Sequence, residues 1–112
     1  MKDELDFICK DFRVKARQVI EKHRLLETLV IGSSEYNIQL EVFNNIMEEL
    51  NKYAEVIYTT ILSYNHAPDT FTKITRNDVL QYQLVQDEVT SFLKENGIFL
   101  NYVHPKDKKN DA

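Results

Sequence analysis

The chain has 112 residues, of which 43% are hydrophobic and 29% are charged, and its net charge is −4. It contains only two glycines and two prolines, whereas average usage would give about thirteen of the two together. This composition excludes turn-rich sandwiches, barrels and βαβ arrays as well as glycine-rich phosphate loops, and the acidic balance argues against a general nucleic-acid binder.

The first predicted helix covers residues 3–31. Apolar side chains recur in it at intervals of three, four or seven residues, which is the spacing of one helical face. This predicted core face comprises Leu5, Ile8, Phe12, Val19, Leu26 and Val30, with Ala16 and His23 in the gaps. Gly32 follows directly, where helices commonly end with a residue of positive φ, so we expect the helix to stop there.

The second predicted helix covers residues 35–65 and starts after Ser33 and Ser34, which are both good N-cap residues. Its apolar positions alternate steps of four and three over four heptads, as in a coiled coil. They are Tyr36, Leu40, Phe43, Met47, Leu50, Ala54, Ile57, Ile61 and Tyr64. Because only a short turn separates the first two helices, we expect them to form a long antiparallel hairpin.

The third predicted helix covers residues 76–96 and follows a loop in which Pro68 prevents the second helix from continuing. Thr75 and Asp78 have the spacing of a capping box at its start. Gly97 is expected to end it, with Ile98 as the hydrophobic contact of a Schellman motif. The predicted core face comprises Val79, Tyr82, Val85, Val89, Phe92 and Leu93.

We expect a single helical domain over residues 1–103, in which the apolar segment 98–103 docks along the bundle, and a disordered charged tail over residues 104–112. The one cysteine, Cys9, cannot close an intramolecular disulfide, which favours a reducing compartment. There is no signal-peptide pattern and no run of about 18 apolar residues. The expected location is therefore the cytoplasm.

The predicted all-α fold leaves apolar surface for a second copy of the chain. The apolar arc of the second helix spans about half its circumference, which is more than one neighbouring helix covers. Residues 7, 14 and 25 lie opposite part of the first helix's core face and contact either the third helix, residues 98–103 or a second subunit. We favour a two-fold dimer that completes the bundle. The predicted oligomer interface comprises Phe7, Val14, Leu25, Ile38, Val42 and Tyr53.

Charged residues form two heptad-spaced rows on the predicted hairpin. Residues 10–24 contain six basic and two acidic side chains. The basic side of the first helix comprises Lys10, Arg13, Arg17 and Arg24, and the acidic row of the second comprises Glu41, Glu48 and Glu55. The rows are in register in a hairpin folded about residues 32 and 33. Since both lie outside the apolar seams, they either meet across a subunit interface or face outside partners.

No constellation in the sequence indicates catalysis, a metal or a cofactor. Arg17 and His23 have the Arg-x5-His spacing of helical HEPN ribonucleases, but a helical wheel separates them by about 120°. His66 and Asp69 have no further Cys or His at metal-binding spacing. We expect Cys9 to be a buried structural thiol, and the protein not to be an enzyme.

These observations favour binding without catalysis. We expect a small interaction or regulatory protein, of the inhibitor, immunity or anti-defence type found on mobile elements, that binds a protein partner through its charged helical face. One alternative is a nucleic-acid-binding regulator that uses the basic row. Another is a bundle that binds a small nucleotide-like anion between subunits. A helical ribonuclease is the least favoured alternative.

Overall fold

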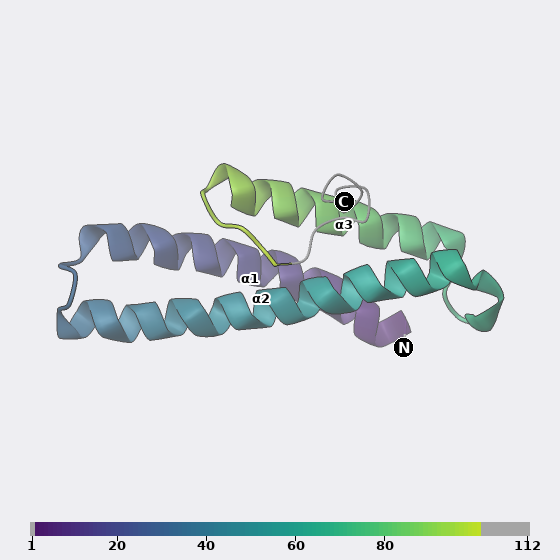
Figure 1. Cartoon of the computed structure of the whole chain (residues 1–112), viewed down its shortest axis with the longest axis horizontal. Coiled ribbons are helices and arrows are strands. Elements are labelled where there is room, and N and C mark those ends of the chain that lie inside the picture. The colour runs from purple at the N-terminus through teal and green to yellow at the C-terminus, as the bar shows by residue number, and fades with distance from the viewer. Residues whose placement is uncertain (1, 102–112) are drawn as a thin grey trace.

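The computed structural model describes residues 2–101, which form three α-helices and a short 3-10 helix. The elements are α1 (Lys2–Thr28), α2 (Ser34–His66), η1 (Pro68–Thr70) and α3 (Arg76–Glu95). Helices α1 and α2 form an antiparallel hairpin, and α3 runs back along it in the direction of α1 (Figure 1). The molecule measures 54 × 33 × 16 Å. The predicted all-α fold, a long helical hairpin with a third helix packed on it, is confirmed.

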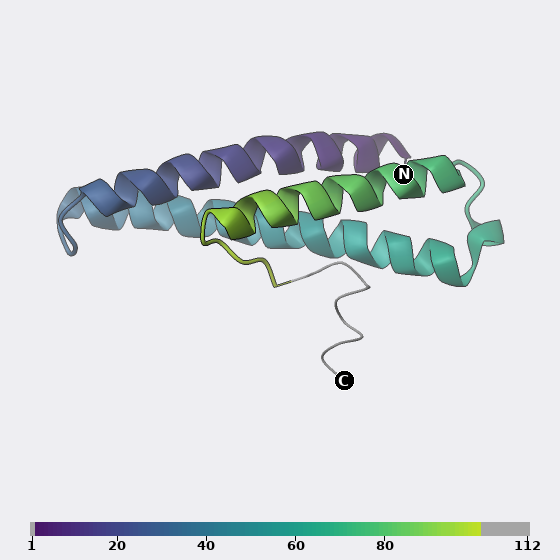
Figure 2. The same cartoon turned by 90° about the horizontal axis from the view of Figure 1, so that it is seen from above.

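Helix α3 covers only part of the hairpin. It packs against both α1 and α2 and ends well before the turn that joins them (Figure 2). Leu50, Ile57 and Ile61, in the covered half of α2, are completely buried. Leu40 and Phe43, nearer the turn, continue the same apolar stripe but are only partly buried. We call residues 23–43 the hairpin tip. There the apolar seam between α1 and α2 is not covered by any other helix of residues 2–101.

The predicted N-caps of α2 and α3 are both present. The Ser33 hydroxyl accepts a hydrogen bond of 3.1 Å from the backbone N–H of Tyr36. At α3, the N–H of Asp78 donates to the Thr75 hydroxyl at 3.1 Å, and the N–H of Thr75 donates to the Asp78 carboxylate at 2.9 Å. The hydrogen bond from the Thr75 backbone holds the pKa of Asp78 below its usual value. Local polar residues thus set both helix starts.

The end of α3 and the segment after it also follow the prediction. Gly97 has a φ of +77°, and the N–H of Ile98 donates back to the last turn of α3 at 2.9 Å, which is a Schellman motif. Ile98 and Leu100 are buried, and the N–H of Asn101 donates to Asn51 of α2 at 2.8 Å. Residues 98–101 therefore dock on the bundle as an extended strip. The expected path of residues 102–103 and the expected tail lie outside the described residues.

The predicted end of the first helix is wrong by three residues. Helix α1 stops at Thr28, whose hydroxyl bonds the Leu25 carbonyl at 2.7 Å. Residues 29–33 form the turn, with Gly32 at a φ of +88°. Val30 was expected in the core but is 76% exposed. Closing a tight antiparallel hairpin requires the chain to leave the helix before Gly32, and this takes Val30 off the buried face.

The predicted core face of the third helix is wrong at one position. Phe92 is 41% exposed, whereas Gln86 is completely buried. Tyr82, Gln86 and Val89 follow one another at spacings of four and three, so Gln86 stands at the centre of the buried stripe. Phe92 lies at the edge of this buried stripe, next to α1. Neither side-chain polar atom of Gln86 has a hydrogen-bond partner among the described residues.

Candidate functional site

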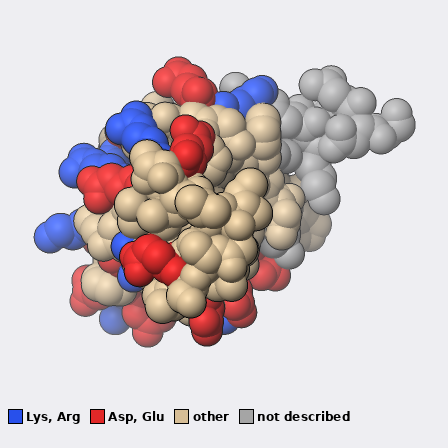
Figure 3. Space-filling view, turned by 90° about the vertical axis from the view of Figure 1, so that its left-hand side faces the viewer, with Lys and Arg blue, Asp and Glu red and all other residues tan. Residues whose placement is uncertain are grey.

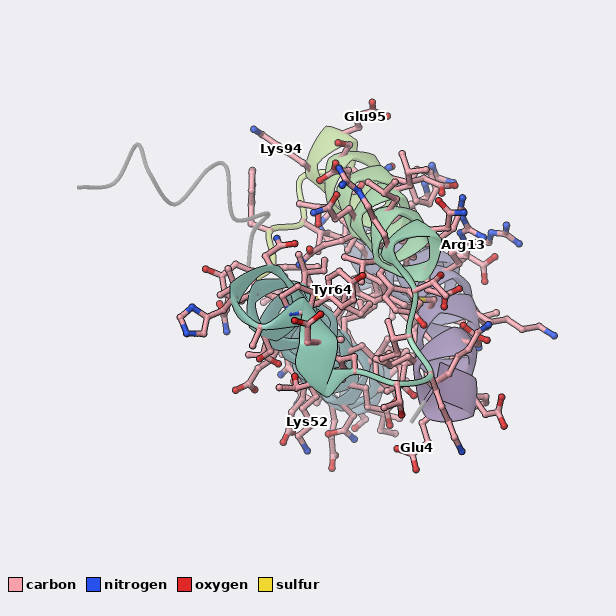
Figure 4. The ribbon with its side chains drawn as sticks, turned by 90° about the vertical axis from the view of Figure 1, so that its right-hand side faces the viewer. Glu4, Arg13, Lys52, Tyr64, Lys94 and Glu95 are labelled. Atoms are coloured by element: carbon pink, nitrogen blue, oxygen red, sulfur yellow. The ribbon has the colours of Figure 1, made fainter. Side chains whose placement is uncertain are left out.

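Part of the basic side of α1 is paired with α3. Arg13 donates to the Glu88 carboxylate at 2.8 Å, and Arg24 donates to the Asn96 side chain at 3.4 Å. Figure 4 shows Arg13 on the side of α1 that faces α3. Both contacts are exposed, so they leave most of the basic surface accessible to a partner.

The remaining predicted partner-binding residues lie on opposite edges of the hairpin. Lys10 and Arg17 are exposed on the outer edge of α1, and neither makes a hydrogen bond or ion pair within residues 2–101. On the outer edge of α2, Glu48 pairs with Lys52 one turn away at 3.4 Å. The acidic row consists of exposed residues, namely Glu41, Glu48 and Glu55. The two rows do not meet inside the described part of the chain.

Three polar contacts join α1 to α2, and the sequence interpretation missed them. We call them the seam ladder: Tyr53 to Asp11 at 2.6 Å, Lys15 to Glu49 at 3.0 Å, and Lys22 to Gln39 at 2.8 Å. The contact with Asp11 raises the pKa of Tyr53 to about 12. Complementary polar residues at equal heights in the hairpin are the signal that would have found the ladder.

The seam ladder lies on the face of the hairpin away from α3. On a helix, Lys15 and Arg13 point about 160° apart, and Arg13 is the residue that reaches α3. The predicted oligomer-interface residues flank this ladder. Phe7 and Ile38 are 61% and 56% exposed. The others are either exposed (Val14, Leu25) or partly buried (Val42, Tyr53).

A trough with a volume of about 390 Å³ runs along the hairpin tip. It continues the groove that α3 fills in the other half of the molecule. The trough is lined by His23, Leu26, Glu27, Leu29, Ile31, Tyr36, Leu40 and Phe43. Figure 3 looks onto this end, which is largely uncharged and has Lys, Arg, Asp and Glu around its periphery. Most of its lining residues are apolar and most are partly buried, and accessible apolar surface of this kind is typical of interaction sites.

A second, smaller cavity of about 240 Å³ lies between α1 and α3. Its lining combines charged and apolar groups: Arg13, Ala16, Arg17, Glu88, Val89 and Phe92. Glu88 offsets the charge of Arg13, so Arg17 supplies the unbalanced positive charge. The cavity therefore suits a contact with an acidic side chain next to an apolar one.

Cys9, His23 and Arg17 lie in three different environments. Cys9 is buried, and burial followed by the Asp6 charge raises its pKa to about 11. His23 lies 3.4 Å from the Glu27 carboxylate and packs near Phe43, while Arg17 points outward. Residues 2–101 contain no group of three or more His, Cys, Asp or Glu that would hold a metal ion.

None of the described helices is long and apolar enough to cross a membrane. Comparisons with protein-family models, with curated proteins and with solved structures find no match to this chain.

Proposed function

We propose that the protein is a non-catalytic interaction or regulatory protein that binds another protein at the hairpin tip. The observation that carries this proposal is the apolar trough. In one half of the molecule the groove between α1 and α2 holds α3, whose Tyr82, Val89 and Leu93 are buried in it. In the other half no element of residues 2–101 fills the same groove. An amphipathic helix of the partner is the occupant that fits it.

The trough also indicates the chemistry of that helix. Its walls are mainly apolar, and exposed Ile31 extends them to the end of the molecule. Glu27 lines the trough, and Arg24 stands beside the end of α3. The proposed helix carries apolar side chains at spacings of three and four, with a basic group placed to meet Glu27. The charged side of α1 orients this partner.

The proposal includes an assembly of two copies that completes the bundle. Its support is the exposure of large apolar side chains on the face away from α3, such as Phe7, Val14 and Ile38. Monomeric proteins seldom leave extended apolar patches in water. A second copy covers this face while the trough of each chain stays open.

Affinity capture with the tagged full-length protein tests the proposed partner site. The wild type is expected to retain a protein that Ile31→Asp loses, because the bound partner helix would bury the new carboxylate without a hydrogen-bonding partner. Leu62→Asp is the matched control, since Leu62 is exposed at the other end of α2. Retention by Ile31→Asp, with circular dichroism unchanged, contradicts the tip as the docking site.

The nucleic-acid alternative is tested with the same protein. Mobility-shift assays at two salt concentrations are expected to show no complex with DNA or RNA. A salt-sensitive shift that Arg17→Glu abolishes would instead favour a regulator that binds phosphates through α1.

A further inference from the structure

We infer that the second copy docks on the face of the hairpin away from α3, related to the first by a two-fold axis parallel to the hairpin. In this arrangement α1 of each copy lies over α2 of the other, and both hairpin tips point to the same end. The inference rests on the proposed two-copy assembly and adds the face, the orientation and the contacts.

Within residues 2–101, no other element covers the face of the hairpin away from α3. In the view along the bundle, α3 lies on one side of α1 and α2, and Glu4 and Lys52 project on the opposite side (Figure 4). Besides the seam ladder, this face carries exposed apolar residues at both ends. These residues are Phe7 and Val56 at one end, and Leu25 and Ile38 near the tip.

The seam ladder fixes which residues lie at equal heights. Lys15 contacts Glu49, and Asp11 contacts Tyr53. Continuing this register places Phe7 at the height of Val56, and Leu25 at the height of Ile38. The two-fold axis places α1 of one copy opposite α2 of the other, and it leaves every residue at the same position along the hairpin. It therefore brings Phe7 against Val56 of the second copy, and Leu25 against Ile38 of the second copy.

The charged edges follow the same register. Arg17 points about 160° and Lys10 about 140° away from Lys15, so these two basic residues lie on the outer edge of α1, where Arg17 also borders the cavity beside α3. By the same argument, the acidic row lies on the edge of α2 opposite to α1. The two-fold lays each basic edge along the acidic edge of the other copy. Its two kinds of ion pair are Lys10 with Glu55 and Arg17 with Glu48, while Arg24 stays with Asn96 at the end of α3.

Charge selects this orientation over its main competitor. A two-fold axis perpendicular to the hairpin stacks the same face but places α1 over α1 and α2 over α2. That arrangement brings basic edge to basic edge and acidic edge to acidic edge. Exposed ion pairs each contribute only about 0.2–1 kcal/mol. Apolar contact therefore supplies most of the stability of the assembly, and the charged edges determine how the two copies are oriented relative to each other.

A charge-exchange experiment tests the inference. One variant carries Lys10→Glu with Arg17→Glu, and the other carries Glu48→Lys with Glu55→Lys. Each variant alone opposes like charges at every altered pair, so its dimer dissociation constant is expected to rise about 30-fold. Mixing equal amounts restores opposite charges at all of these pairs across the interface. Analytical ultracentrifugation of the mixture is expected to show dimers close to wild-type affinity.

A control with the same charge change separates specific pairing from general attraction. Arg76→Glu with Lys94→Glu alters two basic residues of α3, which lies on the far side from the proposed interface. This control is expected to dimerise like the wild type. Mixing it with the Glu48→Lys, Glu55→Lys variant is not expected to increase the affinity of that variant for a second chain. A monomeric wild type overturns the proposed assembly together with this inference. A dimer that the exchanges leave unchanged overturns the inference alone, and the partner capture tests the tip independently.

Discussion

The ammonium of Lys15 lies 3.0 Å from the carboxylate of Glu49, and this ion pair joins α1 to α2 on the side of the hairpin away from α3. The hydrogen bond to Glu49 raises the pKa of Lys15. Because Lys15 faces α2, Arg17 must face outward. The basic residues of α1 therefore cannot reach the acidic row of α2 in the same chain, although the two rows share one register.

Replacing Gln86 with Met is expected to stabilise the protein. The Gln86 side chain is completely buried, and its amide nitrogen and oxygen have no partner among the described residues. A buried amide without partners costs about 1–3 kcal/mol, and an apolar side chain of similar shape avoids this cost. Urea denaturation is expected to show a gain of about 1–2 kcal/mol in unfolding free energy. A loss of stability would show that the amide is satisfied.

The thiol of Cys9 is expected to resist alkylation in the native protein. Its pKa of about 11 leaves little thiolate at pH 8, and the side chain is buried. The rate of modification by iodoacetamide at pH 8 is expected to be at least about tenfold lower in the native than in the urea-unfolded chain. Equal rates would contradict both the burial and the raised pKa.

The capping box of α3 is expected to contribute to stability in a pH-dependent way. Thr75→Ala is expected to cost about 1 kcal/mol. The pKa of Asp78 is lowered in the folded state, so its contribution is present above the usual carboxyl pKa of 3.8 and is lost as the pH falls below it. Asp78→Asn is therefore expected to reduce stability at pH 7 and to weaken its decline in acid. Thermal melts between pH 2 and 7 measure both effects.

A matched control for that experiment is Glu95→Gln, which removes a carboxylate from the other end of α3. It leaves the capping box intact. If Glu95→Gln and Asp78→Asn changed the acid dependence equally, the effect would reflect net charge and not the cap.

Tyr53→Phe is expected to weaken the hairpin slightly. The change removes the 2.6 Å hydrogen bond from Tyr53 to Asp11, which is worth about 0.5–1.5 kcal/mol in a partly buried setting. The wild-type chain is expected to contain a tyrosine that ionises at about pH 12, and the variant is expected to lack it. Ultraviolet titration at 295 nm follows this ionisation. An unchanged titration curve would contradict the hydrogen bond.

The sequence predicts the helices well because their ends carry strong local signals. Ser33, Thr75 and Gly97 determine caps through short-range hydrogen bonds, and the structure has all three. The alternation of four and three in α2 likewise marks the face that packs on α1. The caps depend on neighbours in the sequence, and the alternation can be seen within one helix, so the sequence is enough to show both.

The features that the sequence does not predict depend on the position of α3 on the hairpin. Residue type favours Phe92 over Gln86 for the core, yet the position of α3 on the hairpin buries Gln86. The trough at the tip exists because α3 ends before it reaches the turn between α1 and α2. The periodicity of the sequence does not reveal where α3 ends relative to that turn. The sequence shows the two charged rows but not their separation, which follows from the seam ladder.

The distance between the two hairpin tips in the dimer is the most direct test of the two-fold arrangement. A spin label attached to Ser34→Cys, in a Cys9→Ala background, allows double electron–electron resonance to measure it. The parallel two-fold predicts a distance of about 20–30 Å, which is two to three helix diameters. A distance close to or above the 54 Å length of the molecule would contradict it, because the tips would then lie at opposite ends.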